Sequence, residues 1–135
     1  MALFKFGRKD AGAPVASSDA LVSFLNGFSI EVMPRTAEKI EDFRALLPAG
    51  TRVYIAHIEG TPIEDMAATA KRLRIEGFEP MPHFPARIIK DKAMLADWVA
   101  RYKGEGDVRQ GLILAGNPSK QVGDFHSSMQ LLESG

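Results

Sequence analysis

Cysteine is absent from the 135-residue chain. Disulfide bonds, thiolate nucleophiles and cysteine-ligated zinc or iron–sulfur centres are therefore excluded. The chain also lacks a net charge, because its 17 basic residues balance its 17 acidic residues. A balanced charge gives no general attraction to nucleic acid or to an anionic membrane. We therefore expect no nucleic-acid partner and no membrane association.

Long apolar runs and familiar nucleotide motifs are missing too. No run approaches the roughly 20 apolar residues of a membrane-spanning helix, and the basic start of the chain has no signal-peptide core. We expect a cytoplasmic protein. The sequence has no Walker loop, no Gly-x-Gly-x-x-Gly after a strand and no Gly-x-Ser-x-Gly elbow. These absences argue against P-loop chemistry, Rossmann-type nicotinamide binding and hydrolase triads.

The domain organisation is simple. Residues 1–17 mix basic residues with Ala, Gly, Pro and Ser, and we expect a flexible tail there. Residues 18–135 are long enough for one α/β domain. A short helix, begun by Ser18 or Asp19 and ending near Leu25, is predicted to open this domain.

Four strand-then-helix units are predicted to follow. Period-two patterns and apolar runs predict strands at 28–33, 51–58, 78–84 and 108–115. Amphipathic stripes and caps predict helices at 37–47 with Thr36 as N-cap, from an N-cap at Thr61 to Glu76 with Gly77 after its end, from Asp91 to Gly104 or Gly106, and from Asp124 to the end. The residues expected to face inward are Met66, Ala70 and Leu73 in the second of these helices and Phe125, Met129 and Leu132 in the last. The apolar run Leu112-Ile113-Leu114 predicts a fourth strand that is covered on both faces. Repeated βα units favour parallel strands joined by right-handed crossovers. The predicted fold is thus four consecutive βα units, half of an eight-unit barrel of the TIM type.

Glu31 lies near the carboxyl end of the first predicted strand, where α/β folds build their active sites. A carboxyl group partly shielded in a barrel mouth suits the role of general acid. A solvent-facing glutamate on an edge strand is the alternative, because charged residues are mostly exposed.

Other polar residues follow the remaining strands. His57 and Glu59 end the second strand, His83 the third and Asn117 the fourth. Parallel neighbouring strands would gather them at one rim, where they could move protons or hold a cofactor. His83 could instead be a core histidine with satisfied hydrogen bonds. Glu31, His57 and His83 are metal-ligand types, but no compact metal motif is present, so we predict no metal site.

Three of these segments resemble the methylenetetrahydrofolate reductase family, a group of flavin-dependent (β/α)8 barrels. Phe28-Ser-Ile-Glu-Val-Met-Pro-Arg-Thr resembles the family's first strand, Ser-Phe-Glu-Phe-Phe-Pro-Pro-(Arg/Lys)-Thr. Met81-Pro-His-Phe resembles its third-strand Pro-His-Leu, and Leu114-Ala-Gly-Asn-Pro its fourth-strand Leu-Arg-Gly-Asp-Pro. The resemblance covers residues 28–118 and identifies the sequence as a divergent member.

The resemblance implies both chemistry and residues. It places the catalytic general acid at Glu31 and a flavin-contacting histidine at His83. It also puts Ala115, Gly116 and Asn117 beside the flavin, although Ala115 and Asn117 replace the family's arginine and aspartate. The implied cofactor is FAD, reduced by NAD(P)H. The implied reaction of one-carbon metabolism converts 5,10-methylenetetrahydrofolate to 5-methyltetrahydrofolate.

Four units supply half of such a barrel. We therefore expect a homo-oligomer, or a separate C-terminal half-barrel, to complete the site. The alternative is a non-catalytic half-barrel that serves as a binding or assembly module. A third reading is a barrel enzyme that uses Glu31 and His83 as an acid–base pair without flavin.

Overall fold

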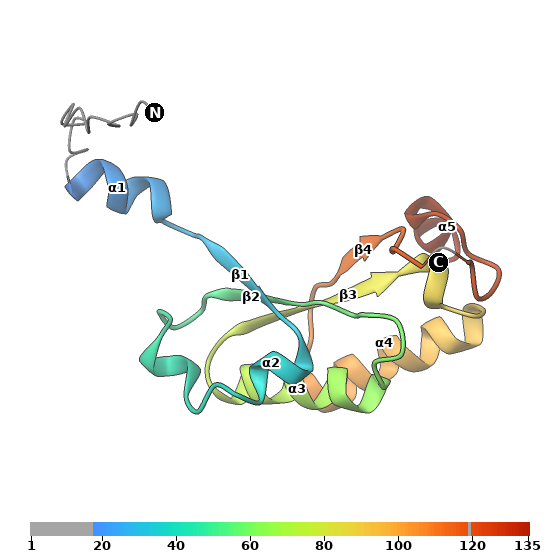
Figure 1. Cartoon of the computed structure of the whole chain (residues 1–135), viewed down its shortest axis with the longest axis horizontal. Helices are drawn as coiled ribbons and strands as arrows, with labels where there is room; N and C mark the ends of the chain where they lie inside the picture. Colours follow the sequence, from blue (N-terminus) through green and yellow to red (C-terminus); the bar gives the residue numbers. More distant parts are fainter. Residues whose placement is uncertain (1–17, 119) are drawn as a thin grey trace, which may run out of the picture.

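The computed structural model describes residues 18–118 and 120–135, so the predicted tail at 1–17 lies outside the described residues. Four parallel strands form one sheet in the order β1-β2-β3-β4 and alternate with helices (Figure 1). The strands are β1 (Ser29–Val32), β2 (Arg52–Ile55), β3 (Glu79–Pro85) and β4 (Leu112–Leu114). The helices are α1 (Ser18–Leu25), α2 (Pro34–Ala37), α3 (Ile63–Ile75), α4 (Lys92–Gly106) and α5 (Ser128–Glu133), with 3₁₀ turns η1 (Phe43–Ala45) and η2 (Ala86–Ile88). The predicted α/β class with parallel strands is confirmed.

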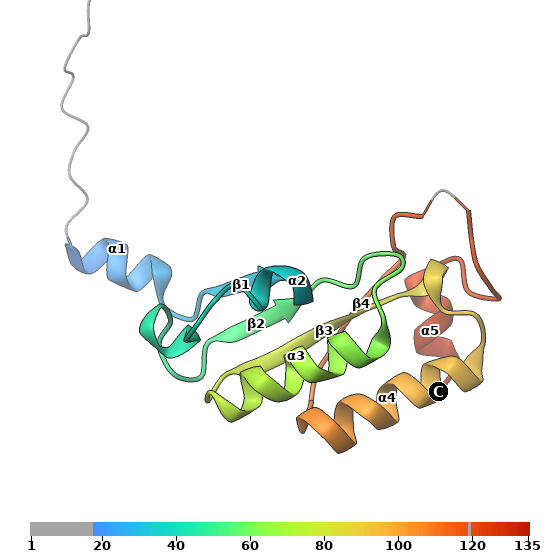
Figure 2. The ribbon, with the colours of Figure 1, turned by 60° about the horizontal axis from the view of Figure 1, so that its bottom comes forward.

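Helices α3 and α4 lie side by side against one face of the sheet (Figure 2). The core between them is mainly apolar: Val53 and Ile55 of β2 and Met66 and Leu73 of α3 have no exposed surface. Tyr102 of α4 reaches β3, where its ring meets Phe84 edge-on at 5.3 Å between centroids. The predicted inward residues of α3 are confirmed, and Leu73 anchors the helix to the sheet.

The opposite face of the sheet carries no helix in the described part of the chain (Figure 2). Because successive strand side chains alternate between faces, the neighbours of the buried aliphatic residues point there. We call this surface the open face. Its members are Ser29, Glu31, Arg52, Tyr54, Glu79, Met81, His83, Leu112 and Leu114.

Pro80 and Pro82 lie inside β3, the longest strand, and Pro85 ends it, although proline cannot donate a ladder hydrogen bond. The Glu79 amide donates to the Thr51 carbonyl of the segment leading into β2, at 3.1 Å. Alternate residues of β3 therefore face β2, while Pro80 and Pro82 direct their backbone nitrogens toward β4. Pairing with β4 begins only at His83. Pro80 and Pro82 thus occupy positions where no neighbouring strand needs a donor.

The prediction of a helix at 37–47 is wrong. The structure has only the short helix α2 and the turn η1 there. Thr36 does not begin the helix; its hydroxyl accepts a hydrogen bond from the Met33 amide, which places Thr36 in the first turn. The Arg72 guanidinium of α3 donates to the carbonyls of Ala37, Ile40 and Glu41 at 2.6–3.1 Å. These carbonyls are satisfied by a side chain rather than by a continued helix.

Arg72 is therefore expected to hold the whole segment between α2 and η1. Its guanidinium also lies 5.1 Å from the Phe43 ring centroid and bonds Glu76 at 2.7 Å. Replacing Arg72 with alanine should lower the free energy of unfolding by about 2–4 kcal/mol, because several carbonyls lose a charged donor. Chemical denaturation measures the change. Arg101→Ala, which removes ion pairs with Asp97 and Glu64 at the surface, should cost about 1 kcal/mol or less. Equal losses would contradict the role of Arg72.

The fourth unit also differs from its prediction. The strand expected at 108–115 is paired only over β4, and Leu112 is exposed rather than covered on both faces. The last helix begins after Ser127, whose capping box with Gln130 replaces the expected Asp124 cap. Phe125 is buried before the helix starts, whereas Met129 and Leu132 of the expected buried stripe are exposed.

Two smaller caps can be compared directly. Asp91 caps α4 as predicted, with its carboxylate accepting the Met94 amide at 2.8 Å. Helix α3 begins one residue later than predicted, because Pro62 rather than Thr61 is its N-cap. Helix α1 has the predicted bounds but buries none of its side chains, so its apolar residues do not pack on the sheet as expected. Within the described ranges, no helix combines the length and apolarity needed to cross a bilayer.

Candidate functional site

Glu31 and His83 meet on the open face. Glu31 Oε2 lies 3.3 Å from His83 Nε2, across the intervening strand β2. The two side chains differ sharply in exposure: 59% of the Glu31 side chain is accessible, against 9% for His83. The expectation that Glu31 is partly shielded is therefore wrong for this chain, because nothing described covers the open face above it. The pair combines an accessible carboxylate with a buried imidazole.

Tyr54 is the residue that the sequence analysis missed. It lies between the pair on β2, with Glu31 as its register partner on β1 and Met81 on β3. Its ring meets the His83 ring edge-on, with 6.1 Å between centroids. The signal was present, because period two places Tyr54 on the same face as Arg52 and opposite Val53 and Ile55.

The Nε2 atom of His83 is buried but has no hydrogen-bond partner in the described residues. The Glu31 contact is close enough for an ion pair but is not aligned as a hydrogen bond. Burial lowers the pKa of His83, and the nearby Glu31 charge opposes that shift. The imidazole is thus kept mainly neutral near neutral pH and offers one unused polar atom to the open face.

His57 does not lie on the open face with Glu31 and His83. Its ring stacks on Trp98 of α4 with 4.5 Å between centroids, which places it on the helix-covered side. Its Nε2 lies 3.0 Å from the Thr61 carbonyl, which can only accept, so Nε2 carries the proton. The Nδ1 atom is buried without a hydrogen-bond partner in the described residues. These contacts favour a structural role for His57 over the predicted cofactor contact, and Glu59, exposed beyond it, does not join the pair either.

The two histidines make stability depend on pH. Burial lowers the pKa of His57 as well, aided by the charge of His83 and opposed by the Thr61 bond. A histidine with a lowered folded pKa binds fewer protons when folded, so its stability contribution is complete above the unfolded pKa of about 6.5 and is lost as pH falls below it. The melting temperature should therefore drop between about pH 7.5 and pH 5.5.

The control for this prediction is the third histidine. His57→Gln should flatten the pH dependence, whereas His126→Gln, at an exposed position, should leave it unchanged. Thermal unfolding followed by circular dichroism at each pH measures both. A melting temperature that rises on acidification would contradict the sign.

The loop after β4 lies at the carboxyl end of the sheet. The Ala115 carbonyl accepts the Arg87 amide at 3.0 Å, which ties this loop to the turn after β3. Gly116 has a φ of +86°, and a Cβ there would lie 3.0 Å from Pro85. Asn117 is exposed. Gly116 therefore lies beside Pro85, two residues beyond His83, and Ala115 and Asn117 flank it in the chain at the same end of the sheet.

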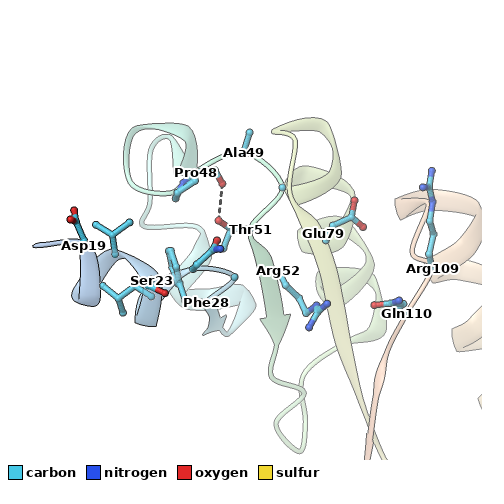
Figure 3. A pocket seen from close by; sticks show the side chains of 15 residues that line it. Asp19, Ser23, Phe28, Pro48, Ala49, Thr51, Arg52, Glu79, Arg109 and Gln110 are labelled. Atoms are coloured by element: carbon cyan, nitrogen blue, oxygen red, sulfur yellow. Dashed lines mark hydrogen bonds between the residues drawn. The ribbon is translucent and has the colours of Figure 1, made fainter.

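A large hollow in the described structure lies away from this pair. It has a volume of about 1260 Å³ and lies at the amino ends of the strands, between α1 and residues that include Arg52, Glu79 and Arg109 (Figure 3). Figure 3 also shows the Thr51 hydroxyl bonded to the Pro48 carbonyl in its wall, at 2.7 Å. The hollow exists because α1 projects from the sheet without burying a side chain. In α/β sheets the amino end is not where chemistry is built.

Neither a metal-binding cluster in the described residues nor a family match is available to identify this site. No group of three or more His, Asp or Glu side chains in residues 18–118 and 120–135 is arranged to hold a metal ion. No family model matches the chain. The functional argument therefore depends on the chemistry of the open face itself.

Proposed function

We propose that the chain is the flavin-binding half-barrel of a divergent methylenetetrahydrofolate reductase-like oxidoreductase. The observation that carries the proposal is the meeting of Glu31 with His83 at 3.3 Å on the open face. Sequence resemblance singled out these same two residues, which lie on strands that are not adjacent. The four parallel βα units would then be the first half of a (β/α)8 barrel. The open face of this chain would correspond to the inner wall of that barrel.

The residues present fit a flavin. The buried Nε2 of His83 lacks a hydrogen-bond partner in the described residues, as expected of a group that awaits a ligand atom. Tyr54, which is half-buried, adds aromatic surface beside it. Ala115, Gly116 and Asn117 offer backbone and amide groups at the same end. A bound flavin, FAD by resemblance, would supply hydride transfer between NAD(P)H and the folate substrate.

The side chains of this chain have separate tasks. Glu31 is exposed, so it can reach a substrate above the open face and deliver a proton to a folate nitrogen as the general acid. His83 is fixed by burial and orients whatever accepts or donates at its Nε2. Tyr54, edge-on to His83, limits the positions that the imidazole can adopt. Such orientation by fixed groups is the main contribution of protein to cofactor chemistry.

A titration with FAD tests the proposal. Saturable quenching of FAD fluorescence, and a yellow protein after gel filtration, are the expected results. His83→Ala should weaken binding by about tenfold, the loss of roughly one hydrogen bond. His126→Ala, at an exposed position outside the pair, is the matched control. Absence of binding at tens of micromolar would reject the flavin assignment for this chain.

The open face also supports a second function, a non-catalytic binding or assembly module. Its exposed edge strands and uncovered face are typical of a surface awaiting a protein partner. Visible absorption by the purified protein distinguishes the two functions, because an assembly module needs no flavin. The flavin-free acid–base enzyme would likewise stay colourless, but its turnover would depend on Glu31.

A further inference from the structure

The sheet ends in two free edges. In the described structure, β1 pairs only with β2, and β4 pairs only with β3. Purely parallel sheets are normally covered on both faces, yet in residues 18–118 and 120–135 helices lie on one face of this sheet alone. Free edges and an uncovered face together are unusual for a stable unit, because each invites pairing with another chain.

The edge of β1 is ready to pair. The Val32 carbonyl accepts the Ala56 amide at 2.8 Å, so alternate residues of β1 direct their backbone groups toward β2. The intervening residues, Ser29 and Glu31, direct theirs outward. By this alternation the Ser29 amide lies on the outer side of β1, away from β2. Along this edge, the backbone groups of Ser29 and Glu31 offer hydrogen-bond donors and acceptors. They lie on the same strand as the Glu31 side chain that meets His83.

An apolar groove borders the other edge. It has a volume of about 730 Å³ and lies on the helix-covered side of β4, between α4 and α5. Its apolar lining includes Leu95, Val99, Ile113, Leu131 and Leu132. Lys92 and Lys103 stand among the lining residues, and no acidic side chain does. A partner that adds a strand to β4 would cover this groove as well.

We propose that a second copy of this chain occupies both edges. The β4 edge of each copy pairs in parallel with the β1 edge of the other, around a twofold axis along the strands. The eight strands then close, and the two open faces become one interior. This proposal deepens the proposed function, on which it rests, because the second copy supplies the missing wall opposite Glu31 and His83.

The surfaces argue for a copy rather than an unrelated partner. The open face carries both signs, because Arg52 is the register partner of Glu79 and Glu31 lies on the neighbouring strand, and the chain has zero formal net charge, so two copies carry no net charge that would repel. Helix α1 leads directly into β1 and exposes Leu21 and Phe24. A copy that docks β1 on β4 brings this apolar helix, with its acidic Asp19, toward the lysine-rimmed groove.

Molar mass tests the proposal. Light scattering after gel filtration should give twice the 14.8 kDa chain mass. Ser29→Pro removes the outward amide of β1 without touching the β1–β2 ladder, so it should raise the dimer dissociation constant at least about tenfold. Ser29→Ala keeps the amide and should behave as the parent chain. Circular dichroism confirms that both variants are folded.

The results that would contradict the dimer differ from those that would contradict flavin binding. A monomer at about 100 μM, or a Ser29→Pro variant that dimerises as well as the parent chain, would overturn the proposal. Mass that grows without limit would also overturn it, because the contact would then be open rather than closed. A monomer that binds flavin would leave the proposed function standing, whereas a colourless dimer would reject the flavin and leave the pairing.

Discussion

Glu31→Gln should reduce turnover of 5,10-methylenetetrahydrofolate by about 10²- to 10⁴-fold, the usual contribution of a general acid. The amide keeps the shape of the side chain but has no acidic proton to deliver. Because 59% of the Glu31 side chain is accessible, folding should be unaffected. Consumption of NAD(P)H by the flavin-loaded protein, with and without the folate, measures the effect.

Flavin affinity and a matched carboxylate provide the controls. Glu31→Gln should bind FAD as the parent chain does, because we assign flavin contact to His83. Glu59→Gln removes an exposed carboxylate that follows β2 but lies outside the pair, and it should retain full turnover. Undiminished turnover by Glu31→Gln would remove Glu31 from the chemistry. Loss of folding instead would make it structural.

The second large effect concerns Tyr102, the largest side chain with almost no exposed surface. It joins α4 to β3 through its contact with Phe84. Tyr102→Ala should cost about 3–5 kcal/mol, because a large cavity replaces an aromatic ring. Domains of this size have a free energy of unfolding of only about 5–15 kcal/mol, so the variant should be near the limit of folding. Denaturant unfolding measures the loss.

Tyr102→Phe separates packing from polarity. The Tyr102 hydroxyl is buried and has no hydrogen-bond partner in the described part of the chain, and burial raises its pKa. Removing an unsatisfied hydroxyl while keeping the ring should be neutral or stabilising. A phenylalanine variant that loses as much stability as the alanine variant would show that the hydroxyl, not the ring, stabilises this contact.

Local rules in the sequence predicted much of this fold. The Asp91 cap, the inward residues Met66, Ala70 and Leu73, and the C-terminal Gly77 of α3 were all readable, because each depends on neighbours within one helix. The proline-containing strand was predicted correctly because it filled the strand position between two helices. These features are set by periodicity and capping, which the sequence shows directly.

Long-range contacts explain what could not be predicted. The segment at 37–47 has a good helical stripe, but Arg72, more than thirty residues later, takes its carbonyls. Nothing near Ile40 in the sequence indicates this. In the candidate site, resemblance picked out Glu31 and His83, whereas Tyr54 became visible only through the strand register. The place of His57 was set by Trp98 on another element.

Mapping the flavin by NMR tests the central claim most directly. Backbone amide spectra and the ring protons of the three histidines would be recorded with and without FAD. The account predicts shifts concentrated at Glu31, Tyr54 and His83, with His126 unmoved. Shifts centred on Arg52 and Arg109 in the hollow at the amino ends of the strands, or no shifts at all, would contradict it.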